Sequence, residues 1–350
     1  MRAVLSFVAR FALLFFVVEG VCSAVSAAVG VWKVVRESPR LHTRYDPLLG
    51  WASVPGLSLP DLYGPGIGFH TNSRGFRGER EVADSPAGRR RIVCSGDSFT
   101  LGVGVRDEDT WCAQLEQLGG DIESVNMGQA GYGVDQAYLW FKRDGTRLER
   151  RLHVFAFVSV DLDRMGADRF AGFGKPFLDL ERGALVTRNV PVPRGPYLFP
   201  WLTLLAPSLD ELRMVLFARR LAAWGGMAVK VQGPQAPPLE LLLAVAQDLA
   251  KLSEAGRSRL AIVYLPTILD MTPNPAFDGW REGLHAAFAS RGFDYVDLVP
   301  DFRAETGGSD LLFLPATVMG RHYTIDGHRL VARVLRERLA PLLAAPEGVP

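Results

Sequence analysis

A serine directly after a short apolar run and an aspartate–histidine pair near the end of the chain have the types to do chemistry together. Ser98 lies in the run Gly-Asp-Ser-Phe-Thr at 96–100, and Asp326 and His328 open the last helical stretch. In a hydrolytic triad the hydroxyl attacks, an imidazole takes its proton, and a carboxylate orients the imidazole. The sequence therefore predicts Ser98 as nucleophile, His328 as base and Asp326 as acid.

The surroundings of Ser98 suit this role. Residues 91–95 have strand character, so Ser98 is expected at the carboxyl end of a parallel strand, where open α/β sheets bind ligands. A helix that begins there offers free N–H groups to developing negative charge. Asp97 is a further candidate site residue beside the nucleophile. The alternative is structural, because Gly-Asp-Ser also makes a good turn and helix cap.

A glycine-rich loop follows the second predicted strand. It runs from Asn126 to Gly133 and contains Gln129 and Gly131. Glycines let a backbone N–H approach a ligand with no Cβ in the way. Gly131 is therefore predicted to supply, with the N–H of Ser98, the oxyanion hole, and Asn126 and Gln129 are possible additional site residues. An ordinary turn is the alternative reading of this loop.

The elements that must position these residues follow from the hydrophobic pattern. From residue 91 onward, short apolar runs alternate with helical periods, which predicts parallel β-α-β units. We expect strands at 92–95, 122–126, 154–160, 260–265 and 295–298, and helices at about 110–118, 134–150 and 327–343. Residues 170–257 break this rhythm and are interpreted as an insertion or lid, with a hairpin at 175–187 and helices at 209–224 and 239–252.

Taken in this order, the motifs resemble the SGNH (GDSL-like) hydrolase superfamily over residues 91–170 and 255–343. The resemblance implies a flavodoxin-like α/β/α sandwich and an ester-cleaving Ser/Asp/His set. It implies that Ser98 is the nucleophile, Gly131 an oxyanion glycine, and Asp326 and His328 the acid and base. The runs at 46–51 and 72–78 look like the membrane-anchored bacterial members of this group.

The chain departs from the family pattern in two places. The last block usually reads D-x-x-H, whereas one residue separates Asp326 from His328. The third block usually reads G-x-N-D, and here Val160 stands at the asparagine position, followed by Asp161, a possible additional site residue. Valine cannot donate a hydrogen bond, and an ionised aspartate only accepts. An α/β-hydrolase is excluded locally, because the context of Ser98 lacks the second glycine of G-x-S-x-G.

Composition excludes some classes of function. The 350 residues contain 39 basic and 38 acidic residues, a net charge of +1, without the concentrated basic face that nucleic-acid binding needs. Three cysteines are too few and scattered for a disulfide framework or zinc site, and Cys94 and Cys112 are expected to be buried small hydrophobes. His322, His328, Asp297 and Asp301 have no metal-ligand spacing. No metal or organic cofactor is implied.

The N-terminus carries a targeting signal. The stretch 11–32 is almost wholly apolar and long enough for one membrane-spanning helix of roughly 20 residues. A cleaved signal peptide is the alternative, with the small residues 24–28 as a cleavage region. We expect residues 1–38 to be the anchor or signal, 39–90 a turn-rich extension packed on the main domain, and 91–345 the catalytic domain, outside the cytoplasm.

These features together predict a membrane-anchored, extracytoplasmic serine ester hydrolase. The expected substrates are acyl or acetyl esters, with cell-envelope glycan esters as one class. Two alternatives remain open. One is a carbohydrate O-acyltransferase that uses the same triad, and the other is a catalytically weak binding or scaffold protein that retains the fold, an alternative favoured by Val160.

Overall fold

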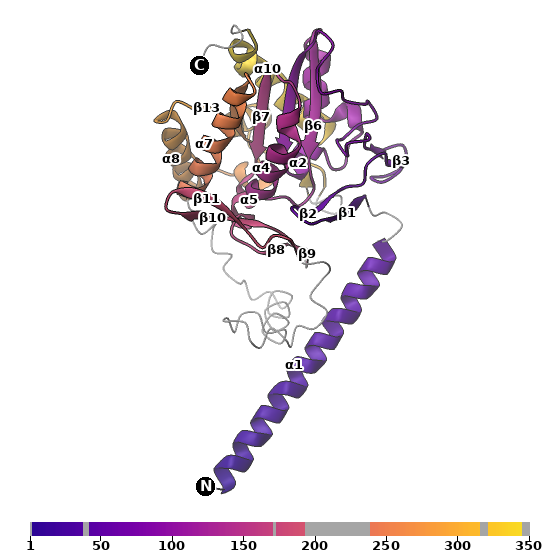
Figure 1. Cartoon of the computed structure of the whole chain (residues 1–350), viewed down its shortest axis with the longest axis vertical. Helices are drawn as coiled ribbons and strands as arrows, with labels where there is room; N and C mark the ends of the chain where they lie inside the picture. Colours follow the sequence, from indigo (N-terminus) through magenta and orange to yellow (C-terminus); the bar gives the residue numbers. More distant parts are fainter. Residues whose placement is uncertain (1, 38–41, 171–172, 193–238, 316–320, 345–350) are drawn as a thin grey trace. The chain divides into compact units, whose positions relative to one another are not determined.

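The computed structural model describes residues 2–37, 42–170, 173–192, 239–315 and 321–344 (Figure 1). The chain divides into two units, one formed by residues 1–41 and 194–233 and the other by residues 42–193 and 234–350. The predicted helix at 209–224 lies outside the described residues. Of the first unit, the structure describes the N-terminal helix. The second unit contains the sheet and all predicted site residues.

A five-stranded parallel sheet forms the centre of the second unit (Figure 1). Its spatial order is β13-β12-β7-β5-β6, which in order of appearance along the chain is 5-4-3-1-2. This is the flavodoxin-like order, so the predicted α/β fold is confirmed. The strand bounds are Arg90–Gly96 for β5, Ile122–Gly128 for β6, Leu152–Phe157 for β7, Arg259–Tyr264 for β12 and Asp294–Asp297 for β13.

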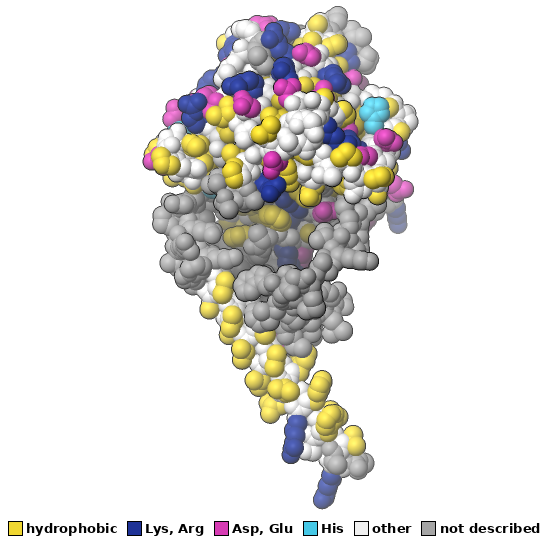
Figure 2. All heavy atoms as spheres, turned by 180° about the vertical axis from the view of Figure 1, so that it is seen from behind, with side chains coloured by type: hydrophobic (Ala, Val, Ile, Leu, Met, Phe, Trp, Pro, Cys, Tyr) yellow, Lys and Arg dark blue, Asp and Glu magenta, His cyan; other side chains and the backbone are white. Residues whose placement is uncertain are grey.

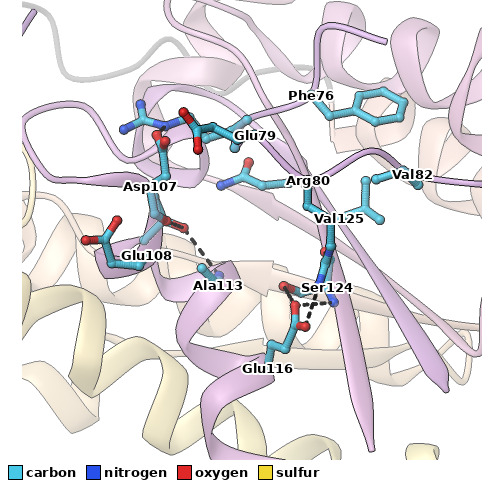
Figure 3. Close-up of a pocket in the computed structure, with 14 residues that line it drawn as sticks. Phe76, Glu79, Arg80, Val82, Asp107, Glu108, Ala113, Glu116, Ser124 and Val125 are labelled. Carbon is cyan, nitrogen blue, oxygen red and sulfur yellow. Dashed lines mark hydrogen bonds and ion pairs between the residues drawn. The ribbon is translucent and has the colours of Figure 1, made fainter. Parts of the chain in front are cut away.

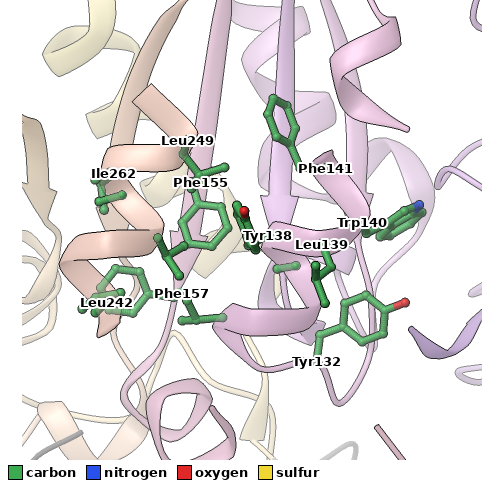
Figure 4. Close-up of a cluster of buried hydrophobic side chains, with 14 of the residues drawn as sticks. Tyr132, Tyr138, Leu139, Trp140, Phe141, Phe155, Phe157, Leu242, Leu249 and Ile262 are labelled. Carbon is green, nitrogen blue, oxygen red and sulfur yellow. The ribbon is translucent and has the colours of Figure 1, made fainter. Parts of the chain in front are cut away.

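Helices cover both faces of this sheet, because its strands are apolar on both sides. One core cluster packs α4, α7 and α8 against residues such as Val93 and Phe155, and Figure 4 shows part of it. The other packs α3, α9 and α10 against residues such as Cys94 and Val154. The helix bounds are Trp111–Leu118 for α3, Val134–Arg143 for α4, Leu239–Ala255 for α7, Pro275–Ala289 for α8, Val299–Thr306 for α9 and Ile325–Ala344 for α10.

Several elements differ from the sequence-based expectation. The third strand ends at Phe157, and residues 159–164 form helix α5 (Ser159–Arg164) instead of extending the strand. The cause is local: the Asp161 carboxylate accepts a hydrogen bond from the Val158 N–H at 3.0 Å and so caps the helix. Helix α4 ends at Arg143, shorter than expected, and a short 3₁₀ turn, η3 (Gly145–Arg147), follows it. Helices α8 and α9 were not predicted.

The segment 42–90 packs along the sheet. It forms two antiparallel pairs, β1 (Thr43–Asp46) with β2 (Gly50–Ser53) and β3 (Ser58–Leu59) with β4 (Phe69–His70). The Tyr132 hydroxyl donates to the Trp51 carbonyl at 2.5 Å, and the Gln136 amide donates to the Leu49 carbonyl at 2.7 Å. These contacts bring Trp51 to the loop that follows β6.

Two hairpins follow α5. The first is formed by β8 (Arg169–Phe170) and β9 (Phe173–Gly174), and the second by β10 (Phe177–Glu181) and β11 (Ala184–Arg188), where the sequence predicts a hairpin. Lys175 connects them to α4: its fully buried ammonium donates to the equally buried Asp135 carboxylate and to the carbonyls of Arg164, Ala167 and Pro176. A buried charge without such partners would be costly, so this cluster fixes the hairpin region.

Cys94 and Cys112 form a disulfide, which corrects the expectation that both are simply buried thiols. Cys94 lies in β5 and Cys112 in α3. They are separated by 18 residues in the chain, yet their Cα atoms lie 6.2 Å apart. The reason is the β-α crossover, since α3 packs back on the sheet face toward which Cys94 points.

Among the described residues of the first unit, helix α1 is long and apolar enough to cross a membrane. Helix α1 spans Arg2–Glu37, and residues Val4–Ser26 form the candidate span. Figure 2 shows hydrophobic side chains along the visible side of this helix, with basic side chains near its lower end.

Candidate active site

Ser98 is the first residue of the short helix α2 (Ser98–Leu101), directly after β5. Asp97 caps this helix, because its Oδ1 accepts a hydrogen bond from the Phe99 N–H at 2.9 Å. The turn holds the Ser98 side chain at the carboxyl end of the sheet, as predicted. Its Oγ lies 2.8 Å from Nε2 of His322 and 3.4 Å from Oδ2 of Asp97.

The histidine in contact with Ser98 is therefore His322. It precedes α10, and its ring lies 4.7 Å, centroid to centroid, from the ring of Phe99. A hydroxyl–imidazole contact of 2.8 Å is the geometry required of a nucleophile and its base. In the sequence, His322 stood out only among residues without metal-ligand spacing, and its contact with Ser98 was not predicted.

His328 lies elsewhere, which corrects its predicted pairing with Ser98. The residue is fully buried, and its Nδ1 accepts a hydrogen bond from the Trp111 N–H at 3.1 Å, at the start of α3. Burial, with smaller effects of His322 and Arg77, lowers the pKa of His328 to about 3. Its Nε2 has no hydrogen-bond partner in the described part of the chain. His328 is thus a neutral residue that joins α10 to α3.

Asp326 also lies apart from the predicted triad. Its side chain is 72% exposed, and its carboxylate pairs with Arg329 one turn further along α10. The physical reason is helical geometry: Asp326 lies on the outer side of α10, whereas His328, Val331 and Leu335 follow its buried stripe. The predicted Asp–His pair therefore belongs to opposite sides of one helix.

The loop after β6 lies next to the end of β5. Gly96 and Gly128 are register partners, and the Gln129 N–H donates to the Gly96 carbonyl at 3.1 Å. Gly131 has a φ of +78°, and a Cβ there would lie 2.9 Å from the Phe170 ring. Glycine is required at this position for both reasons. Its expected oxyanion role stays a prediction.

The two amides of this loop are engaged by the protein. Asn126 donates to the Thr100 carbonyl at 2.8 Å and accepts from the Gly128 N–H at 2.9 Å, so it ties the β6 turn to α2. Gln129 is fully buried, and its Oε1 accepts from the Ser53 hydroxyl at 2.6 Å. Its Nε2 is buried without a hydrogen-bond partner among the described residues.

Two carboxyl groups near the Ser98 turn are buried. Asp97 precedes Ser98, Asp161 lies in α5, and each is 1% exposed. Burial raises the pKa of Asp97, and burial together with the charge of Asp97 raises the pKa of Asp161 well above its usual value. Arg164 opposes both shifts and donates to Asp161 at 2.9 Å. Asp161 is thus held by Arg164 and by the first turn of α5, and its role in the site stays a prediction.

Aromatic rings surround Gly131. The Trp51 ring stacks on Phe170 at 6.4 Å and lies 6.4 Å from Phe173, which is 49% exposed. Nε1 of Trp51 donates to the Ala130 carbonyl at 2.9 Å and so fixes the ring beside the loop. Such a face suits an apolar chain or a sugar ring.

A separate hollow of about 170 Å³ lies along the middle of β6 (Figure 3). Figure 3 shows charged side chains on its wall, among them Glu79, Asp107 and Glu116. Its described lining includes neither Ser98 nor His322. This hollow is therefore distinct from the Ser98 site.

Within the described ranges, no group of three or more histidine, cysteine or acidic side chains has the arrangement of a metal site. Asp297 pairs with Arg281 and accepts from the Val299 N–H at 2.9 Å, and Asp301 pairs with Arg338 at 3.3 Å. These acids stabilise the loops and helices of the second half of the sheet.

No protein-family model matches this chain, and no curated protein matches it. Solved structures do match. A G-D-S-L family lipolytic protein from Veillonella parvula is 14% identical, with a TM-score of 0.40 over 71% of this chain and 97% of the other. A psychrotrophic esterase from Pseudoalteromonas sp. is 11% identical, with a TM-score of 0.40 over 73% and 100%. An acetylxylan esterase from Geobacillus stearothermophilus is 12% identical, with a TM-score of 0.39 over 73% and 95%.

The chain is similar in structure to G-D-S-L lipolytic proteins and esterases. The similarity extends over about 72% of its length. At these identities and TM-scores it concerns the fold and says nothing about activity or about which residues act.

Proposed function

We propose that this protein is a serine ester hydrolase in which Ser98 is the nucleophile and His322 the general base. The observation that carries the proposal is the 2.8 Å contact between Oγ of Ser98 and Nε2 of His322 at the carboxyl end of the sheet. The parallel sheet supports it, because ligands of this fold class bind at that edge.

The reaction is a double displacement. His322 Nε2 takes the Ser98 proton as Oγ bonds to the acyl carbon, and the N–H groups of Ser98 and Gly131 stabilise the oxyanion. The same proton passes to the alcohol oxygen as the acyl C–O bond breaks. A water then gives its proton to His322, attacks the acyl carbon and releases the acid, after which the proton returns to Ser98.

The substrate we propose is an acyl or acetyl ester, with cell-envelope glycan esters as one class. The aromatic face at Trp51, Phe170 and Phe173 supports an apolar or sugar group beside Gly131. Transfer of the acyl group to a carbohydrate hydroxyl is the alternative, since only the acceptor differs. Product analysis with an acetylated glycan, in the presence and absence of a second glycan, separates the two.

A fluorophosphonate probe tests the activated serine without knowledge of the substrate. Full-length protein in detergent is expected to be labelled, and Ser98→Ala and His322→Gln are expected to abolish or greatly slow labelling. Ser95 provides a matched control, because its hydroxyl contacts His153 at 2.6 Å but both residues are fully buried. If Ser95→Ala removes labelling while Ser98→Ala does not, the proposal fails. If wild-type protein is not labelled, the binding-protein alternative replaces it.

A further inference from the structure

The loop that carries Gly131 is held by a part of the chain outside the parallel sheet. Residues 129–133 join β6 to α4, and Gly131 has a left-handed φ of +78°. Within the loop the Tyr132 N–H donates to the Gln129 carbonyl at 3.3 Å, and the Gln129 N–H donates to Gly96 of β5 at 3.1 Å. Further contacts come from the segment 49–53, which contains β2.

One side of this segment faces the loop. Leu49, Trp51 and Ser53 are alternate residues, the period with which side chains of an extended strand share a side. Four hydrogen bonds join the segment to the loop and to the start of α4: the Tyr132 hydroxyl donates to the Trp51 carbonyl at 2.5 Å, Nε1 of Trp51 to the Ala130 carbonyl at 2.9 Å, the Ser53 hydroxyl to Oε1 of Gln129 at 2.6 Å, and the Gln136 amide to the Leu49 carbonyl at 2.7 Å.

The bond from Trp51 determines where the Gly131 N–H points. The Ala130 carbonyl and the Gly131 N–H belong to one planar, trans peptide unit, so they point in opposite directions. Because the indole N–H of Trp51 holds this carbonyl, the Gly131 N–H is directed away from the indole.

Burial strengthens the other anchors of the loop. Gln129 and Tyr132 are fully buried, and Ser53 is 3% exposed. A buried polar group that loses its partner is costly, because water does not replace the lost bond. The residues on both sides of the 130–131 peptide are therefore fixed to β2, and the Gly131 N–H keeps one direction.

We infer that β2 is the element that positions the oxyanion donor, by holding the 130–131 peptide unit with the Gly131 N–H toward the substrate oxygen. Trp51, Ser53 and Tyr132 are the positioning residues. This inference rests on the proposed function, in which the Gly131 N–H stabilises the oxyanion. It makes the segment before the sheet a part of the active site, where the sequence indicated only an extension packed on the main domain.

Variants of the full-length protein in detergent test the inference without altering a group that meets the substrate. Tyr132→Phe and Ser53→Ala each remove one buried hydroxyl, and the double variant removes both. Trp51 is left intact, because its ring belongs to the aromatic face of the proposed substrate site. Tyr45→Phe is the control, since the Tyr45 hydroxyl of the same hairpin donates to the Val192 carbonyl at 2.6 Å, a bond of the same kind outside the loop.

The readouts are kcat and KM on p-nitrophenyl acetate, the pH dependence of fluorophosphonate labelling, and hydrogen exchange of the amides of residues 129–133 by mass spectrometry. In the double variant, kcat is expected to fall about tenfold or more, a part of the about 10²–10³-fold cost of a lost oxyanion donor. KM is expected to change by less than about twofold, because the bond to the oxyanion forms only in the transition state. Loop exchange is expected to be faster, and the pH midpoint of labelling is expected to stay at the wild-type value, since Ser98 and His322 are unchanged.

A merely structural role of these hydroxyls gives a different result. Tyr45→Phe is expected to lower the thermal midpoint about as much as either single variant, since each loses one buried hydrogen bond, and to keep kcat and loop exchange at wild-type values. Unchanged loop exchange in the double variant overturns the inference. A kcat equal to that of Tyr45→Phe also overturns it, and so does a shifted labelling midpoint, which would show that the variant had disturbed His322.

The same experiment separates this inference from the proposed function. If labelling and turnover of the wild-type protein do not depend on Ser98, the hydrolase proposal fails, and the oxyanion role of β2 fails with it. If both depend on Ser98 while the double variant matches Tyr45→Phe in kcat, the hydrolase proposal stands and β2 is only a structural support of the loop.

Discussion

At the scale of single residues, the contact between Ser98 and His322 depends on what surrounds it. Asp97 fixes the serine turn through the Phe99 N–H, and the rings of Phe99 and Tyr323 lie 4.9 Å apart beside His322. Side chains held by such packing keep their rotamers, which is what a proton transfer over one hydrogen bond requires. The preorganisation of this site is therefore local to α2 and the segment before α10.

Val160 stands at the position of the asparagine in the third block of the family pattern, so this position has no side-chain amide to donate a hydrogen bond. It lies in the first turn of α5, half-buried against the core that includes Phe302 and Leu330. Val160→Asn is expected to raise kcat on p-nitrophenyl acetate. The added amide should lower the activation free energy by a fraction of the ~2.7–4 kcal/mol that such donors contribute. The added amide also costs about 1–3 kcal/mol of stability where it lacks a partner.

Val160→Ala is the control for this substitution, because it removes the same packing and adds no donor. Steady-state kinetics and thermal midpoints of both variants, with Ser98→Ala as background, measure the two effects. A kcat for Val160→Asn no higher than that for Val160→Ala would contradict the prediction and indicate that another donor already serves the oxyanion.

His328 is expected to make folding sensitive to acid. Its folded pKa is about 3, whereas an unfolded histidine titrates near ~6.5, so between these values the unfolded state binds the extra proton. The stability contributed by neutral His328 is present above pH ~6.5 and decreases as the pH falls toward ~3, by up to about 1.4 kcal/mol per pH unit. His328→Gln, which keeps an acceptor for the Trp111 N–H, should flatten this slope.

Thermal midpoints of wild type and His328→Gln at several pH values between ~4 and 7, bracketing the histidine range, check this prediction. Burial also lowers the pKa of His153. The difference in thermal midpoint between the two proteins reports His328 alone, because His153 is present in both. Parallel loss of stability in both proteins as the pH falls would show that His328 is not the titrating group.

At the scale of elements, α3 is held from two sides. The Cys94–Cys112 disulfide joins it to β5, and His328 of α10 accepts from the N–H of its first residue. The disulfide lies in the strand that leads to the Ser98 turn, since Cys94 belongs to β5 and α2 follows β5.

Loss of the disulfide is expected to lower the free energy of unfolding. Its loop of 18 residues corresponds to about 3 kcal/mol by chain-entropy arguments. The double variant Cys94→Ala/Cys112→Ala avoids a free buried thiol, and Cys22→Ala in α1 is the control. Thermal midpoints under non-reducing conditions measure the difference. Three reactive thiols in unfolded, non-reduced protein would show that the bond does not form.

At the scale of the whole molecule, the sequence predicted the sheet well and the site only in part. Strand runs such as 260–265 are unbroken apolar stretches, and such patterns identify buried parallel strands. Helix α8 was missed because Gly279 and Gly283 weaken its pattern, although Asn274 before Pro275 is a helix-start signal. The Cys94–Cys112 bond is non-local and has no signature in a chain with three cysteines.

The predicted contact between His328 and Ser98 is absent, and His322 makes that contact instead. The prediction rested on the Asp-x-His spacing. His328 falls on the apolar stripe of α10 with Val331 and Leu335, a register that indicates a buried structural residue. His322 precedes the helix, where a loop can reach the end of β5. His322 and His328 are close in sequence, and tertiary packing decides which of them contacts Ser98. In the sequence, the helical register of His328 was the feature that indicated a buried structural role.

The last prediction concerns the membrane. We expect α1 to remain in the mature protein as an anchor with the second unit outside the cytoplasm, because the Val4–Ser26 span is longer than the usual ~7–15-residue signal core. The disulfide between Cys94 and Cys112 agrees with an oxidising compartment. Membrane fractionation with carbonate washing, and mass spectrometry of the mature N-terminus, are the measurements. A soluble mature form that begins near residue 28 would contradict the anchor while leaving the compartment unchanged. Thiol labelling in intact cells, with Cys22→Ala as background, tests the compartment separately: free Cys94 and Cys112 thiols in fresh lysate would place the second unit in the cytoplasm.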